Sequence, residues 1–437
     1  MERKMSRRDL FKYVGVGAAG AALTACAPGT GGTTGGKKYA GKKIRMLSQG
    51  GAGYEKALTQ YGKEFEEQTG CKVEFDWAPW ENLMPKLQAD LASGSPQLDI
   101  FCNDREFQYT VWPELLPLDD LIKKYNYDMN GFLKPVYNFG QGIAGQKVRF
   151  GLPVAPGVSV IFYRTDLIPQ FPTTWADYEK LLVDMKEKTG KPPLGFAGVA
   201  AQLVKAFWAR YWSMKQPNIS KDWKVLIAND TGVKAATMLY DFYKKYTPQG
   251  MLAWDNPDGC NAFKAGDIVV LESWPGFCLE GFEASDSKVK GKWSMSPYPE
   301  GGSGNYVEHN MVILKKSKNP DAAFEFIAYC TDLTRSKRSA IEFKVDPARE
   351  AVYDDSEVKS KSPWMPAYKN VLNAGLVPFF GIPYWLEMFI ALAEGLSTIL
   401  AEKATPKAAL SDVAAKWEKL IKDSPLNFEY NELPGGK

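Results

Sequence analysis

The chain alternates strand and helix patterns from Ile44-Arg45-Met46-Leu47-Ser48 to Leu98-Asp99-Ile100-Phe101-Cys102. Both of these runs are apolar enough for buried strands, and between them Val73-Glu74-Phe75-Asp76-Trp77 alternates as a strand does. After the first strand, apolar residues stand at helical spacing from Leu58 to Phe65, with Gly70 near the end of that helix. A second helix is predicted over about 81–92, after the strand that ends at Trp77. We therefore predict an α/β fold with a largely parallel sheet covered by helices on both faces.

Polar residues follow the last of these strands. In open sheets of this class, ligands bind beyond the carboxyl ends of the strands. The segment after Cys102 is Asn103-Asp104-Arg105-Glu106, which is either an ordinary loop or part of a site. The pattern alone leaves both alternatives open.

The middle of the chain predicts a passage between two lobes. Residues 151–164 form an extended apolar segment that begins with a glycine and is interrupted by two prolines and a second glycine, which suit a bent strand better than a central ladder. Thr174 is placed to cap a helix with a buried face over 178–185. The C-terminal third is expected to be mostly helical, with amphipathic stripes over 386–400 and 410–421.

Residues 1–26 resemble a bacterial export signal. Arg7 and Arg8 form the pair of a twin-arginine signal, but Leu10 and Phe11 stand in reversed order, which leaves the export route open. The apolar run over 13–23 is too short to cross a bilayer, which takes about 20 residues. We therefore interpret this run as part of a cleaved signal rather than a membrane anchor.

The signal ends in Leu23-Thr24-Ala25-Cys26, which resembles a lipobox. If Cys26 is lipidated, residues 27–41, rich in Gly and Thr, form a flexible tether, and the folded part begins near Lys42. We expect the protein to be a lipoprotein at the extracytoplasmic face of the cell membrane, in the periplasm if the organism has an outer membrane. Its acyl chains, rather than a transmembrane helix, would hold it there.

Composition limits the function classes. The chain has 437 residues, 45% of them hydrophobic and 13% aromatic, which is enough for two lobes of ordinary size. Its net charge of +3 is nearly balanced, so we expect no nucleic-acid partner.

Cysteine and histidine usage indicates neither a metal nor another cofactor. The cysteines beyond Cys26 show no C-x-x-C spacing. Cys260 and Cys278 either form a disulfide outside the cell or stay buried thiols. The single histidine, His309, excludes sites made of two or three imidazoles, and we expect it in the core or at the edge of a binding site.

With these segments in place, the chain resembles the family 1 extracellular solute-binding proteins of ABC importers, particularly those for sugars and polyols. The similarity covers essentially everything from Lys42 to Ile421, and its motifs are specific by their order and spacing rather than singly. The motifs include Leu98-Asp99-Ile100-Phe101, Phe162-Tyr163-Arg164, Ala262-Phe263-Lys264-Ala265-Gly266-Asp267, Ser273-Trp274-Pro275-Gly276-Phe277 and Lys318-Asn319-Pro320-Asp321.

The resemblance implies a two-lobed fold of the periplasmic-binding-protein type II, with a ligand cleft between the lobes. The chain would cross between the lobes near Val154, Asn310 and Val345. Lobe I would then comprise residues 42–153 and 310–345, and lobe II residues 154–309 and 346–437.

A sugar site needs flat aromatic faces for C–H groups and directional polar groups for hydroxyls. Most of the 13 tryptophans fall within strand or helix patterns, where we expect them in the core. Trp80, Trp274 and Trp385 stand on loops or element ends and are the aromatic candidates, together with Gly276 in the break after Trp274.

The polar candidates depend more on the resemblance. Asp104 and Arg105 match an Asp-Arg pair that binds sugar hydroxyls in maltose-type binding proteins, which implies the same role here. Glu308 and Asn310, which flank His309, are secondary candidates. Glu272 is another, although a carboxylate beside Trp274 is equally compatible with a structural role.

These features together predict a monomeric lipid-anchored receptor that captures a sugar, oligosaccharide or polyol and delivers it to the permease subunits of an ABC transporter. One alternative is a binding protein of the same build for a peptide, a polyamine or a metal chelate. Another is an exported carbohydrate-active enzyme, which needs two carboxylates about 5–10 Å apart, drawn from Asp104, Glu106, Glu272 and Glu308. No motif sets two of them opposite each other, so we predict no catalytic residues and no enzyme activity.

Overall fold

The computed structural model describes residues 36–133, 148–301, 305–373, 377–378, 382 and 384–423. The predicted export pair Arg7 and Arg8, the lipidation site Cys26 and residues 27–35 of the tether lie outside these ranges. Within the described ranges, no helix has both the length and the apolar character needed to cross a membrane.

Six strands form the first sheet, in the order β10-β9-β3-β1-β2, with β4 also paired to β9. They are β1 (Lys43–Gln49), β2 (Lys72–Ala78), β3 (Ile100–Asp104), β4 (Gly151–Val158), β9 (Asn305–Ile313) and β10 (Val377–Pro378). β1 runs parallel to β2 and β3, as predicted, whereas β9 is antiparallel to both β3 and β4. The sheet is therefore mixed rather than largely parallel, because β4 and β9 are not part of the β-α-β alternation that orders the first three strands.

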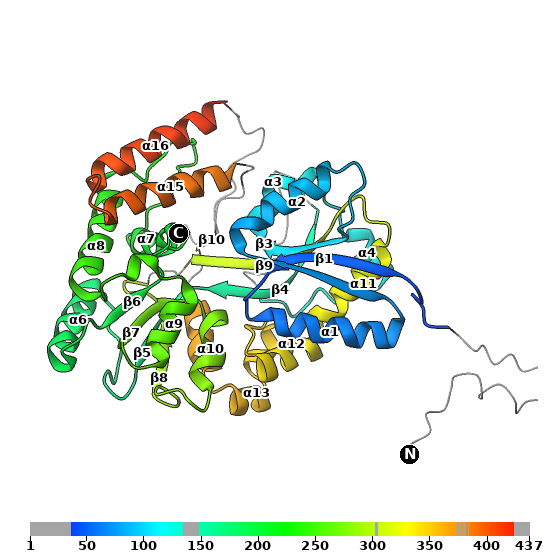
Figure 1. Cartoon of the computed structure of the whole chain (residues 1–437), viewed down its shortest axis with the longest axis horizontal. Coiled ribbons are helices and arrows are strands. Elements are labelled where there is room, and N and C mark those ends of the chain that lie inside the picture. The colour runs from blue at the N-terminus through cyan, green and yellow to red at the C-terminus, as the bar shows by residue number, and fades with distance from the viewer. Residues whose placement is uncertain are drawn as a thin grey trace, which may run out of the picture. The chain divides into compact units, whose positions relative to one another are not determined.

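Helices cover both faces of this sheet, as the alternation predicted. Side chains on a strand point alternately to opposite faces. Accordingly Phe101 packs in the cluster that contains helices α2 (Leu83–Ala92) and α3 (Arg105–Val111), whereas Ile100 and Cys102 pack in the cluster of α1 (Tyr54–Thr69) and α11 (Pro320–Thr331). Figure 1 shows α1 and α11 on the side of the strands opposite to α2 and α3.

The second sheet has four strands in the order β6-β7-β5-β8. They are β5 (Val160–Arg164), β6 (Leu194–Phe196), β7 (Val270–Ser273) and β8 (Trp293–Ser296). Only Ser159 separates β4 in the first sheet from β5 in the second, so the extended segment predicted over 151–164 is confirmed as a direct passage between sheets. In Figure 1, β4 and β9 extend toward the side on which α7 and α10 lie. The residue boundaries of the two lobes stay a prediction.

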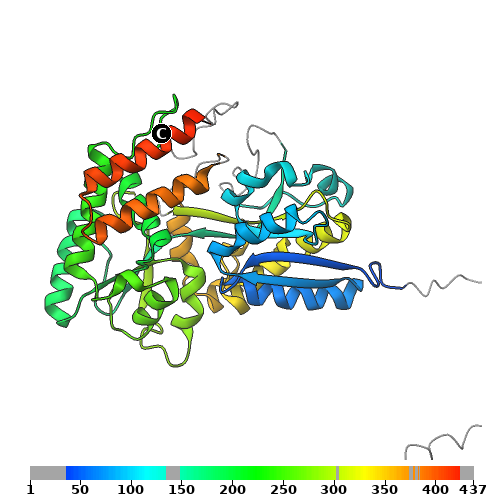
Figure 2. The same cartoon turned by 45° about the horizontal axis from the view of Figure 1, so that its top comes forward.

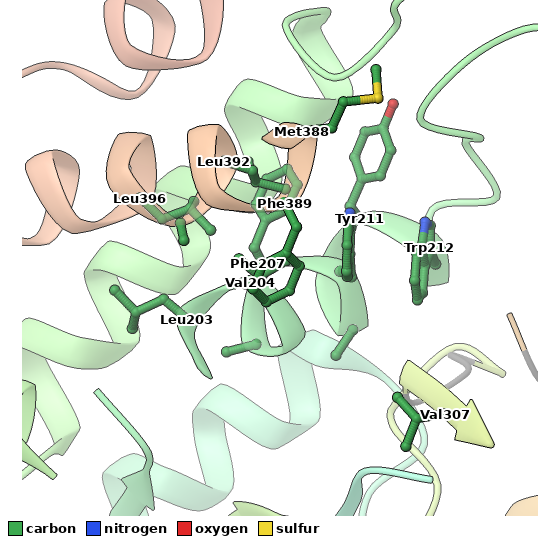
Figure 3. Close-up of a cluster of buried hydrophobic side chains, with 14 of the residues drawn as sticks. Leu203, Val204, Phe207, Tyr211, Trp212, Val307, Met388, Phe389, Leu392 and Leu396 are labelled. Carbon is green, nitrogen blue, oxygen red and sulfur yellow. The ribbon is translucent and has the colours of Figure 1, made fainter. Parts of the chain in front are cut away.

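Helices of the second half pack on one another. Thr174 caps α6 (Trp175–Thr189) as predicted, since its hydroxyl oxygen accepts a hydrogen bond from the backbone N–H of Asp177 at 3.1 Å. α15 (Trp385–Leu400) lies against both α7 (Ala200–Ser213) and α16 (Pro406–Asp423), and Figure 2 shows α15 and α16 side by side. In Figure 3, Phe207 of α7 lies close to Phe389 of α15, in the buried cluster that joins these helices.

The remaining described helices surround the two sheets. They are η2 (Trp80–Asn82), η3 (Trp112–Glu114), α4 (Asp119–Lys124), α8 (Asp230–Tyr246), η4 (Met251–Ala253), α9 (Asn256–Lys264), α10 (Pro275–Glu283), α12 (Leu333–Arg338), η5 (Ser339–Phe343), η6 (Glu350–Tyr353), α13 (Ser356–Lys361) and α14 (Met365–Asn373). Cys260 and Cys278 form a disulfide, which ties α9 to α10 and decides between the two alternatives left open by the sequence. Cys71, Cys102 and Cys330 are buried free thiols.

Candidate ligand-binding site

A cavity of about 110 Å³ lies where residues from both sheets meet. The first sheet and its loops contribute Gly53, Asp104 and His309, and the elements around the second contribute Lys205 and Trp274. One ordered water needs roughly 10–15 Å³ of this kind of volume, so the cavity has room for about seven to eleven waters. That space suits a single small polar solute.

Three of the predicted tryptophans line this cavity: Trp80, Trp274 and Trp385. The Trp80 ring centroid lies 5.1 Å from that of Phe107 and 5.6 Å from that of Phe389. Trp385 is almost fully buried, whereas Trp80 and Trp274 are half-buried and keep part of their rings accessible. Segments far apart in the chain thus bring aromatic rings to one cavity.

Trp274 is positioned by the end of a strand and the start of a helix. It follows β7 directly and forms the N-cap of α10, where Pro275 at the first helical position turns the chain. Its indole Nε1 donates to Oε1 of Gln202 on α7 at 3.3 Å. Gly276, also predicted, lines the cavity one residue beyond Pro275.

Asp104 organises the first-sheet side of the cavity. Its Oδ2 accepts a hydrogen bond from Nε1 of Trp80 at 2.9 Å, and its Oδ1 lies 3.1 Å from Nε2 of His309. The antiparallel pairing of β3 with β9 places Asp104 opposite His309, and Tyr54 packs on the imidazole with ring centroids 4.9 Å apart. The strand extends to Asp104, two residues further than predicted, because β9 supplies a partner. Asp104 therefore orients both the indole and the imidazole that line the cavity.

Four predicted polar residues are not among those that line the cavity: Arg105, Glu272, Glu308 and Asn310. Glu308 and Asn310 are neighbours of His309 in β9, and neighbouring side chains in a strand point to opposite faces. Both are buried away from the cavity side that His309 occupies. Burial raises the pKa of Glu308 to about 7, with the charge of Arg105 acting in the opposite direction. Arg105 is itself buried at the start of α3.

Glu272 lies in a buried ion pair. Its side chain and that of Arg210 are both 0% exposed, and the two form a bidentate contact, with Nη1–Oε2 at 3.0 Å and Nη2–Oε1 at 2.9 Å. The Tyr178 hydroxyl lies 3.4 Å from Oε1. This pair holds α7 to β7, which favours the structural interpretation of Glu272. The side chain of Glu106, the remaining acidic candidate, lies outside the described part of the chain.

Lys205 and Asp346 also line the cavity, and the sequence analysis missed both. Nζ of Lys205 donates to Oδ1 of Asn256 at 2.9 Å, and burial lowers the pKa of this lysine to about 7. Asp346 accepts a hydrogen bond from the Tyr368 hydroxyl at 2.9 Å, and burial raises its pKa to about 7. The one available signal for Lys205 was its position as a lone charge in the run Leu203-Val204-Lys205-Ala206-Phe207-Trp208.

Two glycines meet at the edge of the cavity. A Cβ atom placed on Gly53, just before α1, would lie 2.8 Å from the carbonyl oxygen of Gly276 in α10. Beside this contact, Nζ of Lys56 lies 2.6 and 2.8 Å from the two carboxylate oxygens of Glu280. Helix α1 packs against the first sheet and α10 packs against the second, so this contact joins the two sides of the cavity directly.

Among the residues that the structure describes, no group of three or more His, Cys, Asp or Glu side chains is arranged to hold a metal ion. The chemistry available in the cavity is stacking on indole rings, hydrogen bonding and interaction with the charges of Lys205, Asp104 and Asp346. These are the groups of a binding site for a polar small molecule.

Comparison with known proteins agrees with this geometry. The model of the bacterial extracellular solute-binding protein family matches residues 51–332. A probable amino-acid ABC transporter periplasmic-binding protein of Sinorhizobium fredii is 24% identical over 401 residues, covering 88% of this chain and 91% of that protein.

Solved structures share the two-lobed fold. T. maritima MalE3 with bound maltose has a TM-score of 0.78 at 22% identity, covering 86% of this chain and 99% of that one. A solute-binding protein of Agrobacterium radiobacter in complex with ribitol has a TM-score of 0.77 at 20% identity, covering 88% and 100%. Since the family model spans more than half of the sequence, the chain belongs to the bacterial extracellular solute-binding proteins of ABC transporters.

Proposed function

We propose that this protein captures a single small carbohydrate, a sugar or polyol, in the cavity and delivers it to the permease subunits of an ABC transporter. The observation that carries this proposal is the convergence of Trp80, Trp274 and Trp385 on one cavity that also contains charged hydrogen-bonding groups. Indole rings suit the C–H faces of a carbohydrate, and carboxylate and ammonium groups suit its hydroxyls.

The relatives support this ligand class without defining it. The T. maritima and A. radiobacter structures contain maltose and ribitol, whereas the S. fredii relative is named for amino acids. The room for about seven to eleven waters favours a monosaccharide or a linear polyol over a long oligosaccharide.

Binding rather than hydrolysis is supported by the positions of the acidic residues. Of the three sequence-predicted carboxylates with described side chains, Asp104 lines the cavity, whereas Glu272 and Glu308 do not. The second carboxylate in the lining, Asp346, accepts a hydrogen bond from the Tyr368 hydroxyl. Asp104 itself is bound to Trp80 and His309. We therefore assign no catalytic role to these residues.

Delivery of the solute to the permease requires that ligand binding changes the relative position of the two lobes. A ligand that contacts both sides of the cavity favours the arrangement in which the sides are close, and a permease can recognise that arrangement. We propose that the monomeric protein is held at the extracytoplasmic membrane face through a lipidated Cys26, after export directed by Arg7 and Arg8. Mass spectrometry of the protein isolated from membranes should detect acyl chains on Cys26, and C26A should be released from the membrane fraction.

Isothermal titration of the purified full chain with monosaccharides, polyols, oligosaccharides and amino acids tests the ligand class. We expect at least one monosaccharide or polyol to bind. If the protein is folded by circular dichroism and none of these carbohydrates binds, the proposed ligand class is wrong.

A further inference from the structure

Lys205 is a buried cation in the wall of the cavity. The residue is 2% exposed, lines the cavity from α7 and has its Nζ 5.6 Å from the ring centroid of Trp274. An ammonium group has three N–H donors, and among the described residues Nζ forms one hydrogen bond, to the neutral amide oxygen of Asn256. Its donor capacity is thus only partly used by the protein.

No carboxylate of the described residues forms an ion pair with Lys205. Glu272 and Asp255 act on it electrostatically, but each has its own partner. Glu272 is bound by Arg210 through both oxygens, and Asp255 caps the first turn of α9. Burying a charge without a paired counterion is unfavourable, and the lowered pKa of Lys205 is consistent with this environment.

Two other buried cations among the described residues, Arg210 and Arg349, are more fully satisfied. Arg210 has two bonds to Glu272 and one to the carbonyl oxygen of Ala206. Arg349 donates to four oxygen atoms, from Tyr127, Asp128, Asn130 and Thr331. Lys205 differs from them because it lines a cavity, where a bound molecule can supply the missing partner.

A second donor stands on the same face of α7. Gln202 precedes Lys205 by three residues, about one helical turn, and lines the same cavity. Its Oε1 accepts from Trp274, which leaves the Nε2 amide group as a donor. An ammonium and an amide one turn apart can bind the two oxygens of one carboxylate.

We propose that the solute is an acidic carbohydrate, a sugar or polyol that carries a carboxylate, and that Lys205 with Gln202 binds this carboxylate beside Trp274. The inference rests on the proposed function and narrows its ligand class. Across the cavity, Asp104 and Asp346 supply acceptors for hydroxyl groups. A carboxylate directed at Lys205 gains a counterion, whereas one directed at the two aspartates is repelled.

Matched pairs of ligands test the proposal. Isothermal titration compares D-glucuronate with D-glucose and D-gluconate with D-glucitol, and L-glutamate serves as an acid that is not a carbohydrate. The proteins are the wild type, K205M, K205Q and K180M. Lys180 is a control because it is an exposed lysine on α6. We expect an acidic member to bind about tenfold more tightly than its neutral partner, because a hydrogen bond to a charged group contributes about 1.4 kcal/mol more than a neutral one.

In K205M and K205Q the acid should lose about thirtyfold or more in affinity, as expected when one partner of a buried charge pair is removed. In the same variants the neutral ligand, which loses one hydrogen bond to the ammonium group rather than an ion pair, should lose clearly less affinity than the acid does, and K180M should match the wild type. Equal binding of acid and neutral ligands, or an equal loss of both in the Lys205 variants, overturns the acidic class but leaves carbohydrate binding intact. Binding of L-glutamate without any carbohydrate overturns both proposals.

Discussion

The contact between Gly53 and Gly276 predicts that a single methyl group will impair ligand binding. An ideal Cβ on Gly53 would lie 2.8 Å from the Gly276 carbonyl oxygen and 3.3 Å from its Cα. Gly53 has φ −53° and ψ −29°, an ordinary helical conformation, so alanine is acceptable to the backbone and only space is at issue. G53A therefore tests the approach of α1 and α10 without a backbone penalty.

The expected loss of ligand affinity in G53A follows from the cost of overpacking. Forcing one extra methyl group into a close contact costs about 1–3 kcal/mol. If the bound state needs this contact and the free state can relax it, that cost appears in the affinity, as an increase in Kd of about 5- to 150-fold. The melting temperature without ligand should change little.

The assay is titration of the carbohydrate that binds most tightly, together with thermal unfolding of the free protein. G281A is the matched control, because Gly281 lies in α10 and its Cβ would meet only Cδ of Lys264, at 3.9 Å. We expect this variant to bind like the wild type. Wild-type affinity in G53A would show that ligand binding does not require the α1–α10 contact. A fall in melting temperature with unchanged affinity would show that the contact stabilises the free protein instead.

Three further predictions concern the charged groups. Removing one partner of the buried pair, as in E272M or R210M, should destabilise the protein by about 3–5 kcal/mol and lower its melting temperature, whereas the double variant R210M/E272M should lose less than the sum of the two single losses; additive losses would contradict the pairing. D104N should weaken carbohydrate binding about tenfold, because an amide cannot accept from both Trp80 and His309; titration that finds no loss would exclude a positioning role for Asp104. Affinity for an acidic sugar should fall between pH 6 and pH 9, because Lys205, with a pKa of about 7, loses its charge while Asp346, with a raised pKa of about 7, gains one. Among the described residues, the other titratable groups that line this cavity or act on the lysine are Glu272, Asp255, Asp104, His309 and Tyr54. A neutral polyol should show a much smaller change over the same range, and equal pH profiles for the two ligands would contradict the role of Lys205.

Secondary-structure features that depend on neighbouring residues were predicted correctly. The order of strand and helix from β1 to β3 and the cap at Thr174 follow from side-chain periodicity and a hydroxyl at the right position, which are properties of neighbouring residues. The tryptophans at element ends were also recognisable as cavity candidates. A large aromatic residue beside the end of a strand or helix does not fit the periodic pattern of core residues. Only the tertiary structure shows that these three tryptophans line one cavity.

The sequence did not predict which of several neighbouring polar residues would line the cavity. His309 lines the cavity while Glu308 and Asn310 do not, because β9 pairs with β3 and β4 in a register that directs alternate side chains to opposite faces. Glu272 faces Arg210, which lies 62 residues earlier in the chain.

The sequence by itself determined the α/β class, the aromatic candidates and the signals expected at the N-terminus. Strand register and helix packing decided which charges are paired within the protein and which, like that of Lys205, are left for a ligand. The physical reason is that a charge is satisfied by groups close in space, and their distance along the chain is not encoded in any local pattern.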